Sequence, residues 1–355
     1  MTAIELLHPA STSDVVEMLR ASSSTGRRVL VTGGRQHLDK GNPVAVDAEL
    51  WTTQLDGVEH YEPAEMVAVV GAGMRVRDLD AVLAEGGQEW PHDAAGETTV
   101  GGVIASAATS PRRLRMGAIR DSVLEVHLVT GDGRLVRGGG RTVKNVTGYD
   151  LPRALTGSLG TLGVLVQVAI KVRPLPRARR TLHIKTDDPI AVGGAVLHAV
   201  PLPVAVLATP GAVQVRLEGW PDEVTEQTEA ARAIAGIHAA VEDDEPFPIE
   251  RPWTDAPIVA EVAVAPSRVS DILPFCGDVW GTPLGTGLVW AAAADDVALA
   301  TLRERVGPTG VAPVIAGPGG LGGCDLGTTE AVHRRLKHAF DPGGVLAPGR
   351  GWGGI

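Results

Sequence analysis

Cysteine is almost absent from this chain, and so are other signs of a secreted or membrane-spanning protein. The two cysteines, Cys276 and Cys324, cannot form a disulfide framework and do not make a Cys-x-x-Cys pair. No run of about 18 uninterrupted apolar residues occurs, so we expect no membrane span. Residues 1–10 lack the charged start and apolar run of a secretion signal. We therefore expect a cytoplasmic protein, either free or held peripherally at the inner membrane through partners.

Positive charge and aromatic side chains are scarce as well. The 32 Lys and Arg residues are outnumbered by 42 Asp and Glu residues, which gives a formal net charge of -10. Nucleic acids bind basic surfaces, so this balance argues against a nucleic-acid partner. Aromatic residues make up 3% of the chain and apolar residues 44%, so the core must consist mainly of Val, Leu, Ala and Ile. A chain of 355 residues is long enough for two domains with a substantial core.

Common catalytic and nucleotide-binding motifs are missing. The chain has no Gly-x-x-x-x-Gly-Lys-Ser/Thr loop, no Gly-x-Ser-x-Gly elbow and no His-Glu-x-x-His helix, so kinase, hydrolase and metalloenzyme functions lose support. The ten histidines are scattered singly, and we predict no metal site. Residues 317–322 and 349–354 match Gly-x-Gly-x-x-Gly, but too little chain follows either match to complete a Rossmann unit.

Three glycine-rich stretches in the first half of the chain stand out instead. Residues 29–34, 96–103 and 157–164 each combine glycines and small hydroxyl residues with an apolar run. Glycine has no Cβ, so such stretches let backbone N–H groups approach a bulky anion closely. Three such approaches indicate one long phosphorylated ligand that lies across several loops.

Strand and helix signals alternate around these stretches. Val123 to Val129, a Thr-Gly-Asp-Gly turn and Leu135 predict a hairpin, and Thr99 can cap a short helix. Ser11 or Thr12 can cap a helix near the start of the chain. The expected strands of the first half are residues 28–31, 44–47, 66–70, 123–129 and 164–172, and the expected helices are residues 75–84 and 99–107.

The composition changes at Arg177-Ala178-Arg179-Arg180, which we interpret as a domain boundary. From residue 182 to residue 316 a β-α-β-β pattern occurs twice, with an acidic, proline-rich linker at residues 242–253 between the copies. Twin units of this kind predict an antiparallel sheet with helices on one face. Residues 329–340 then read as a helix, ended by an Asp-Pro-Gly-Gly stop signal.

Taken in order, these segments resemble the FAD-binding domain of the vanillyl-alcohol oxidase or para-cresol methylhydroxylase (PCMH) type. Within that family, residues 144–151 followed by 157–164 look most like the FAD-binding subunit of bacterial glycolate oxidase. The likeness covers residues 1–176 and 328–355. The residues that carry it are Gly33-Gly34, residues 98–107, Gly117 before Arg120-Asp121, residues 157–164 and the closing segment 341–350.

The resemblance implies an α+β fold in three parts. A two-subdomain PCMH-type FAD-binding domain would occupy residues 1–176, and a ferredoxin-like antiparallel α+β cap domain residues 177–327. Residues 328–355 would then pack back on the FAD domain. It also implies a non-covalent FAD, with the pyrophosphate on backbone N–H groups of residues 32–37 and 98–102. The implied cofactor-binding residues are Thr32, Gly33, Gly34, Arg35, Gln36, His37, Pro91, Thr98, Thr99, Gly101, Gly102, Ser106, Gly117, Arg350 and, near the adenosine end, Gly160, Gly163 and Val164.

Three departures from the family pattern bear on the chemistry. Only two glycines precede Arg35-Gln36, so His37 is displaced from the position that carries a covalent flavin in some relatives, and we expect a plain loop histidine. Ala347 stands where the closing motif usually has asparagine. The His-x-Gly-Asp-Gly-Asn metal and substrate segment of the 2-hydroxyacid-oxidising relatives has no match.

The catalytic residues stay unknown at this stage. A flavin enzyme that oxidises a 2-hydroxy acid needs a base for the hydroxyl proton and cations for the carboxylate. Tyr149-Asp150 is a candidate pair, but its spacing suits a helix N-cap better. Further candidates that form no recognisable constellation are His92, Asp93, Arg112, Arg113 and Arg115.

Three functions remain open. The first is an FAD-binding subunit of a glycolate or D-2-hydroxyacid oxidase, which is an FAD-dependent oxidoreductase. A catalytic sister flavoprotein would oxidise the small 2-hydroxy acid, and an iron–sulfur subunit would take the electrons. The second is a self-sufficient FAD-linked 2-hydroxyacid dehydrogenase. The third is a structural subunit that has lost the flavin.

Overall fold

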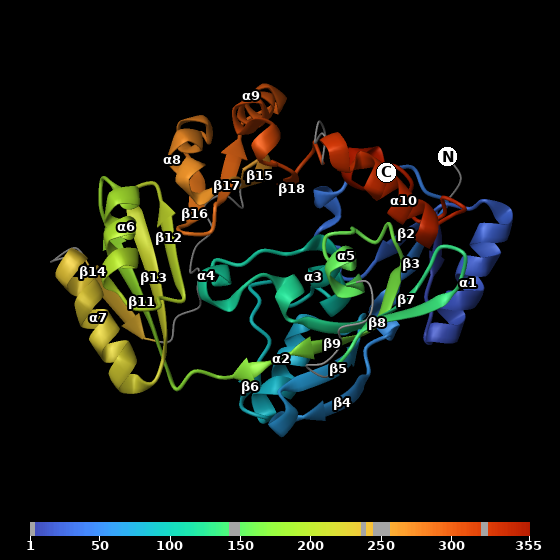
Figure 1. The fold of residues 1–355 in the computed structure, drawn as a ribbon, viewed down its shortest axis with the longest axis horizontal. Helices are drawn as coiled ribbons and strands as arrows, with labels where there is room; N and C mark the ends of the chain where they lie inside the picture. Colours follow the sequence, from blue (N-terminus) through green and yellow to red (C-terminus); the bar gives the residue numbers. More distant parts are fainter. Residues whose placement is uncertain (1–3, 142–149, 236–238, 244–255, 321–325) are drawn as a thin grey trace. The chain divides into compact units, whose positions relative to one another are not determined.

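The computed structural model describes residues 4–141, 150–235, 239–243, 256–320 and 326–355 (Figure 1). The chain divides into two compact units, and each is described by itself. The first unit comprises Met1–Ala108, Ala118–Leu175 and Leu321–Ile355, and the second comprises Thr109–Gly117 and Pro176–Gly320. The short excursion of residues 109–117 into the second unit has no counterpart in the sequence-based boundaries.

The first unit begins with a small parallel sheet of order β1-β3-β2. Its strands are β1 (Glu5–Leu7), β2 (Val29–Thr32) and β3 (Ala48–Trp51). Helix α1 (Thr12–Thr25) starts at Ser11, whose hydroxyl accepts a hydrogen bond from the backbone N–H of Asp14, while the Asp14 carboxylate accepts one from the N–H of Ser11. The helix shares a buried core with the sheet and with Val345 and Leu346. Strand β2 then leads straight into residues 33–42, which we call the first loop.

The strand predicted at residues 44–47 is wrong in its position along the sequence. The strand is Ala48–Trp51, because pairing with both neighbours starts at Ala48. Asp47 instead binds Arg28 through its carboxylate. The carboxylate accepts hydrogen bonds from the backbone N–H of Arg28 at 2.9 Å and from the Arg28 guanidinium at 3.0 and 3.1 Å. This ion pair lowers the pKa of Asp47 to about 2.

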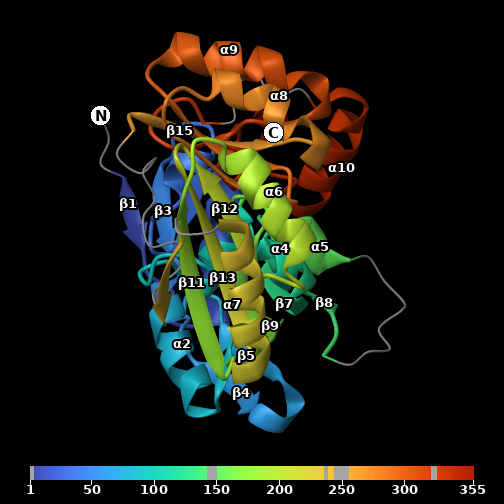
Figure 2. The ribbon, with the colours of Figure 1, turned by 90° about the vertical axis from the view of Figure 1, so that its left-hand side faces the viewer.

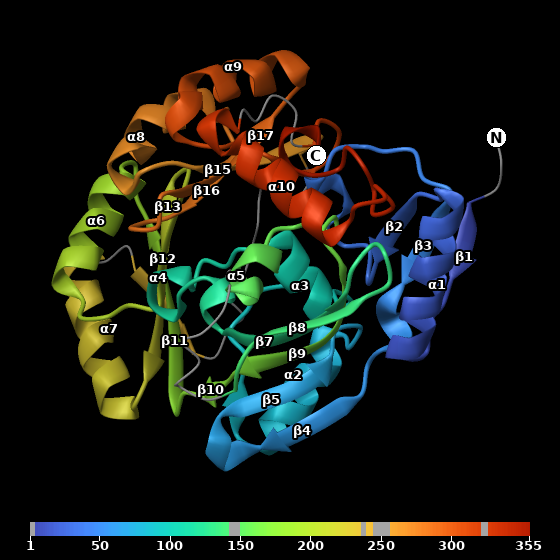
Figure 3. The ribbon, with the colours of Figure 1, turned by 45° about the vertical axis from the view of Figure 1, so that its right-hand side comes forward.

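A second sheet of the first unit is antiparallel, with the order β4-β5-β9-β7-β8. Helices α2 (Val76–Glu85) and α3 (Val100–Ser106) lie beside it and share its buried core (Figure 3). The predicted hairpin is confirmed as β7 and β8, and Thr99 caps α3 by accepting from the N–H of Gly102. The strands are β4 (Val58–Glu62), β5 (Val67–Gly71), β7 (Val123–Val129), β8 (Leu135–Gly139) and β9 (Val164–Lys171); short elements are β6 (Gln88–Glu89), β10 (Arg173–Pro174) and α5 (Leu151–Leu155).

The second unit is built on one eight-stranded antiparallel sheet of order β14-β11-β13-β12-β16-β17-β15-β18. The two predicted β-α-β-β copies therefore merge, because β12 pairs with β16 at Leu207 and Ala208. The strands are β11 (Ala178–Lys185), β12 (Ala205–Thr209), β13 (Ala212–Gly219), β14 (Ala239–Asp243), β15 (Ile258–Ala263), β16 (Trp280–Pro283), β17 (Leu288–Ala293) and β18 (Val314–Ala316). Of the predicted linker at 242–253, residues 242 and 243 belong to β14, and the rest lies outside the described residues.

Helices cover one face of this sheet, as predicted. Figure 2 shows α6 (Pro189–Ala199) and α7 (Pro221–Ala235) lying over β11, β12 and β13. Side chains alternate along each strand, so that Leu182 and Ile184 of β11 pack in the core with both helices. Helices α8 (Val269–Ile272) and α9 (Asp296–Val306) form a second core with β15 and β17, and α4 (Arg113–Met116) comes from the excursion at residues 109–117.

The last helix of the first unit, α10 (Glu330–Phe340), is tied to the closing segment by a buried ion pair. The Nζ of Lys337 lies 2.7 Å from the Oδ2 of Asp341 and donates to the carbonyl oxygens of Thr161 and Leu346 at 2.8 and 2.7 Å. The Asp341 carboxylate, with no exposed side-chain surface, accepts from the N–H groups of Val345 and Leu346 at 2.9 and 2.8 Å. Burial lowers the pKa of Lys337, and the hydrogen bond and charge of Asp341 oppose that shift.

We expect Asp341→Ala to lower the free energy of unfolding by about 3–5 kcal/mol, because it leaves a buried Lys337 without its counter-ion. Urea denaturation measures this change. The matched control is Glu330→Ala on the same helix, which removes an exposed ion pair with Arg334 and should cost less than about 0.5 kcal/mol. Equal small effects in both variants would contradict the structural role given to the buried pair.

No helix among the described residues combines the length and the apolar character that crossing a membrane requires.

Candidate functional site

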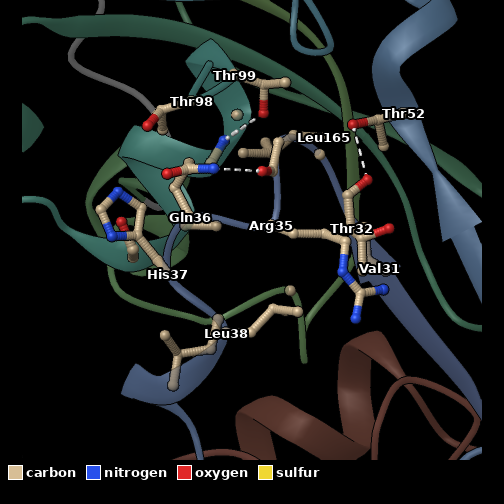
Figure 4. Close-up of a pocket in the computed structure, with 18 of the residues that line it drawn as sticks. Val31, Thr32, Arg35, Gln36, His37, Leu38, Thr52, Thr98, Thr99 and Leu165 are labelled. Carbon is tan, nitrogen blue, oxygen red and sulfur yellow. Dashed lines mark hydrogen bonds between the residues drawn. The ribbon is translucent and has the colours of Figure 1, made fainter. Parts of the chain in front are cut away.

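All three glycine-rich stretches line one cavity of about 90 Å³ in the first unit (Figure 4). They approach it from the end of β2, from the start of α3 and from the loop before β9. The predicted site residues that line it are Thr32, Gly33, Gly34, Arg35, Gln36, His37, Thr98, Thr99, Gly101, Gly102, Ser106, Gly160, Gly163 and Arg350. Lining residues absent from the predicted set are Val31, Leu38, Thr52, Ala105, Ser158, Leu159 and Leu165.

Three predicted site residues do not line this cavity. Pro91 follows the buried Trp90, whose indole N–H donates to the hydroxyl of Ser122 at 2.9 Å. Val164 is fully buried in the core around β2 and β3, and Gly117 belongs to the second unit. Thr52 was missed although it follows β3, the parallel neighbour of β2; parallel strands end at the same edge, which is the signal that could have found it.

The glycine pair of the first loop brings two loops together. A Cβ added to Gly33 would overlap the hydroxyl of Thr99, and one added to Gly34 would overlap the carbonyl oxygen of Glu97. Gly102 is less crowded, because a Cβ there would lie 3.1 Å from the Thr99 hydroxyl. Gly33 and Gly34 are therefore required for contact between the first loop and the segment that precedes α3.

Most backbone donors at the start of α3 are already used. The N–H groups of Val100 and Gly101 donate to the carbonyl oxygens of Met74 and Ala72 at 2.8 and 2.7 Å, and that of Gly102 donates to the Thr99 hydroxyl at 3.1 Å. The first loop differs: within the described part of the chain, the N–H groups of Gly34 and Arg35 donate no hydrogen bond. An anion would therefore find its backbone donors in the first loop.

The conformation of that loop suits an anion. Arg35 has a φ of 57°, in the left-handed region that non-glycine residues rarely adopt. A left-handed residue among right-handed or extended ones lets consecutive N–H groups converge into an anion-binding concavity. Gln36 braces the turn, since its side-chain amide donates to the carbonyl oxygen of Gly34 at 3.0 Å (Figure 4).

Two buried hydroxyls in the cavity have no hydrogen-bond partner among the described residues. They are the Oγ1 atoms of Thr32 and Thr98. A buried hydroxyl without a partner costs about 1–3 kcal/mol, so such atoms indicate a polar ligand that completes them. Thr52 is different, because its hydroxyl donates to the carbonyl oxygen of Thr32 at 3.2 Å. The lining thus fits a phosphorylated cofactor through hydroxyls and free N–H groups.

The two arginines that line the cavity are both engaged by the protein. The guanidinium of Arg35 pairs with the buried carboxylate of Glu49 and lies 5.5 Å from the ring centroid of Trp51. The guanidinium of Arg350 donates to the carbonyl oxygen of Leu38 at 2.8 Å and to that of Asn42 at 3.4 Å. Burial lowers the pKa of Arg350 from its usual value, although the charge of Asp39 opposes the shift.

Arg350 and Asn42 clamp the first loop to the closing segment reciprocally. The side-chain amide of Asn42 donates to the carbonyl oxygens of Gly349 and Gly351, both at 3.0 Å, and its N–H donates to the carbonyl oxygen of Arg350 at 2.9 Å. Nearby, Ala347 has a φ of 40°, a left-handed conformation that asparagine tolerates better than alanine. The closing segment therefore positions the loop that carries the free N–H groups.

The candidate catalytic residues are dispersed. The Nε2 of His92 lies 3.1 Å from the carboxylate of Asp80, and its Nδ1 accepts from the N–H of Ala94, so this ring is held in place away from the cavity lining. Asp150 caps α5 as predicted, while Tyr149 lies outside the described residues. Asp93 does not line the cavity, and Arg112, Arg113 and Arg115 belong to the second unit. No group of three His, Cys, Asp or Glu suited to a metal ion occurs among the described residues.

We expect Arg350→Met to loosen the first loop, because it removes the donor from two partly buried carbonyl oxygens, those of Leu38 and Asn42. The free energy of unfolding should fall by about 1.5–3 kcal/mol, and amide hydrogen exchange should quicken at residues 38–42. Arg335→Met, at an exposed position on α10, is the control and should change neither quantity. Unchanged exchange in the Arg350 variant would contradict the clamp.

Comparison with known proteins agrees with this geometry. A family model described as an FAD binding domain matches residues 5–139. The glycolate oxidase subunit GlcE of Escherichia coli (strain K12) is 32% identical over 306 residues, which are 83% of this chain and 84% of that subunit. D-lactate dehydrogenase of Archaeoglobus fulgidus is 32% identical over 180 residues, covering 50% of this chain and 41% of that enzyme.

A solved structure of alkyldihydroxyacetonephosphate synthase shares the fold. It aligns over 97% of this chain and 75% of its own chain with a TM-score of 0.69 and 14% sequence identity. The near full-length likeness to a curated relative and the matching FAD-binding model agree with the cavity lined by three glycine-rich stretches. The chain belongs to the PCMH-type family of FAD-dependent oxidoreductases, and its cofactor is non-covalent FAD.

Proposed function

We propose that this chain is the FAD-binding subunit of an oxidase complex that acts on glycolate or another D-2-hydroxy acid. The observation that carries the proposal is the likeness to a glycolate oxidase subunit over 84% of that protein's length. In this proposal a catalytic sister flavoprotein oxidises the small 2-hydroxy acid, and an iron–sulfur subunit accepts the electrons. Attachment to the inner membrane would come through these partners.

The cofactor's pyrophosphate is proposed to lie against the first loop. The free N–H groups of Gly34 and Arg35 and the hydroxyls of Thr32 and Thr98 would bind its oxygens, with no lysine needed. A cavity of about 90 Å³ holds only part of a dinucleotide, so the rest of FAD would extend beyond these residues. We place the adenosine end near Gly160, whose φ of 76° requires glycine. When bound, FAD supplies the redox chemistry.

The lining supports a carrier of electrons better than an independent dehydrogenase. Its titratable side chains are Arg35, His37 and Arg350, and both arginines are held by protein groups. A substrate hydroxyl needs a base, and a substrate carboxylate needs available cations. The second candidate, a self-sufficient dehydrogenase, is favoured by the likeness to D-lactate dehydrogenase, of which this chain spans 41%.

The purified chain should be yellow, with flavin absorbance at about 450 nm. Dithionite should bleach that absorbance, whereas glycolate or D-lactate added to this chain alone should not. Bleaching by either acid alone would establish the self-sufficient dehydrogenase instead. A colourless protein that takes up no added FAD would mean that the fold is kept as a structural subunit.

Thr98→Val should separate cofactor binding from folding, because valine has nearly the shape of threonine but lacks the unpartnered hydroxyl. We expect the flavin-free protein to be as stable as the parent or slightly more so, and FAD to bind about fivefold to tenfold more weakly. Thermal unfolding of the flavin-free protein and FAD titration measure the two effects.

The matched control is Thr52→Val, which removes a hydroxyl that does have a partner in the protein. That variant should destabilise the flavin-free protein by about 1 kcal/mol. If Thr98→Val instead destabilised the flavin-free protein and left FAD affinity unchanged, the hydroxyl would serve folding and not the cofactor.

A further inference from the structure

A second cavity, of about 490 Å³, lies wholly within the second unit and far exceeds the first in volume. It is formed where β13 ends and α7 begins, with one wall from α4 and another from the turn before β12. Its size is within the range of small-molecule and side-chain pockets. The lining residues are Arg115, Pro201, Leu202, Glu218, Gly219, Trp220, Glu223, Glu226 and Gln227.

The polar atoms of this cavity are mostly acceptors. Three carboxylates line it, those of Glu218, Glu223 and Glu226, against the single guanidinium of Arg115. Arg115 already donates to the carbonyl oxygen of Leu202 at 3.3 Å. Arg216 offsets the charge of Glu218, which leaves the carboxylates of Glu223 and Glu226 against Arg115. The remaining negative charge favours a ligand that is both cationic and rich in donors.

Two of these acceptors are buried and without a hydrogen-bond partner in the described structure. The side chain of Glu218 is 4% exposed, and its Oε1 accepts from the guanidinium of Arg216 at 2.9 Å, but its Oε2 has no partner. The guanidinium of Arg112 is also near, at 3.9 Å from Oε1. The side-chain oxygen of Gln227 is likewise buried and unpartnered. Such atoms are costly unless a donor completes them.

The rim is apolar and unusually exposed. Trp220 is 64% exposed and Leu202 is 67% exposed, and Leu202 holds a left-handed φ of 54° that is rare for a leucine. An exposed indole beside carboxylates offers a face for a cation as well as for apolar groups. Exposed apolar residues around a polar centre are typical of a surface that contacts another polypeptide.

We propose that this cavity binds the guanidinium group of an arginine side chain presented by a partner polypeptide. Guanidinium has five N–H donors and no acceptor, so it can serve the free oxygens of Glu218 and Gln227 together and can stack on Trp220. Apolar residues beside that arginine would cover Leu202 and the rest of the indole. The inference goes beyond the proposed function, since it needs neither the flavin nor its cavity.

Binding of a short capped peptide to the full-length chain tests this directly. The probe is Ac-Ala-Leu-Arg-Leu-Ala-NH2, and the control peptide has citrulline, a neutral isostere, in place of arginine. Calorimetry should detect the arginine peptide, with at least about tenfold weaker binding of the citrulline peptide. Equal binding of both peptides would overturn the proposal.

Substitutions at exposed residues of the cavity should weaken binding of the arginine peptide without disturbing the fold. The double variant Glu223→Gln with Glu226→Gln should weaken binding of the arginine peptide about tenfold, as two lost charge contacts predict. Glu229→Gln, on the same helix but outside the cavity, is the matched control and should bind normally. Trp220→Ala should weaken binding further than Trp220→Phe, which keeps an aromatic face. Normal binding in the double variant would contradict the assigned site.

A second binding experiment, with N-acetyl-arginine amide, distinguishes a partner polypeptide from a small-molecule ligand. A partner polypeptide predicts that this small probe binds about tenfold more weakly than the peptide, because it cannot cover Leu202. If the small probe bound as tightly as the peptide, the cavity would be a small-molecule site and the polypeptide partner would be wrong.

Discussion

Backbone contact between the first glycine-rich loop and the segment before α3 is the constraint on which the candidate site depends. Neither Gly33 nor Gly34 can carry a Cβ without overlapping atoms of residues 97–99. The contact fixes the loop, and the N–H groups of Gly34 and Arg35 stay free within the described structure. In the facing segment, by contrast, the N–H groups of Val100 and Gly101 donate to the carbonyl oxygens of Met74 and Ala72. The segment before α3 thus supports the first loop, and the first loop is the proposed binding surface.

Support for the binding loop also comes from far along the chain. Arg350 and Asn42 join the closing segment to it, and the buried pair of Lys337 and Asp341 joins that segment to residues 157–163 through the carbonyl oxygen of Thr161. Charged side chains around the cofactor cavity are therefore used mainly to hold the backbone in place. In the proposed binding mode, main-chain donors and hydroxyls bind the cofactor's phosphates, and these groups need no counter-ion of their own.

Much of the fold could be predicted because it depends on local pattern. Apolar runs such as residues 123–129 and 164–172 are long enough to read as strands, and Thr99 is recognisable as a helix cap. The convergence of the three glycine-rich stretches also followed from the sequence and the resemblance. By contrast, residues 44–47 read as a strand because their apolar character is local, whereas the true start at Ala48 is set by pairing with two other strands.

The parts that escaped prediction depend on tertiary partners. Whether an N–H of α3 is free depends on carbonyl groups about thirty residues away, and whether Arg35 faces the ligand depends on Glu49 and Trp51. The acceptor-lined cavity of the second unit joins Arg115 to residues a hundred positions later, so no local motif marks it. Patterns in sequence predict elements well, but they do not record which donors and acceptors remain unused.

The parallel bridge between Val29 and Leu346 has a consequence for biosynthesis. Strand β2, which leads into the first loop, obtains this neighbour only after residue 346 has left the ribosome. Until then Arg350 cannot bind the carbonyl oxygens of the first loop, so the cofactor cavity of the nascent chain is incomplete. We therefore expect flavin to be taken up only after residues 346–350 have been synthesised and have packed on the first loop.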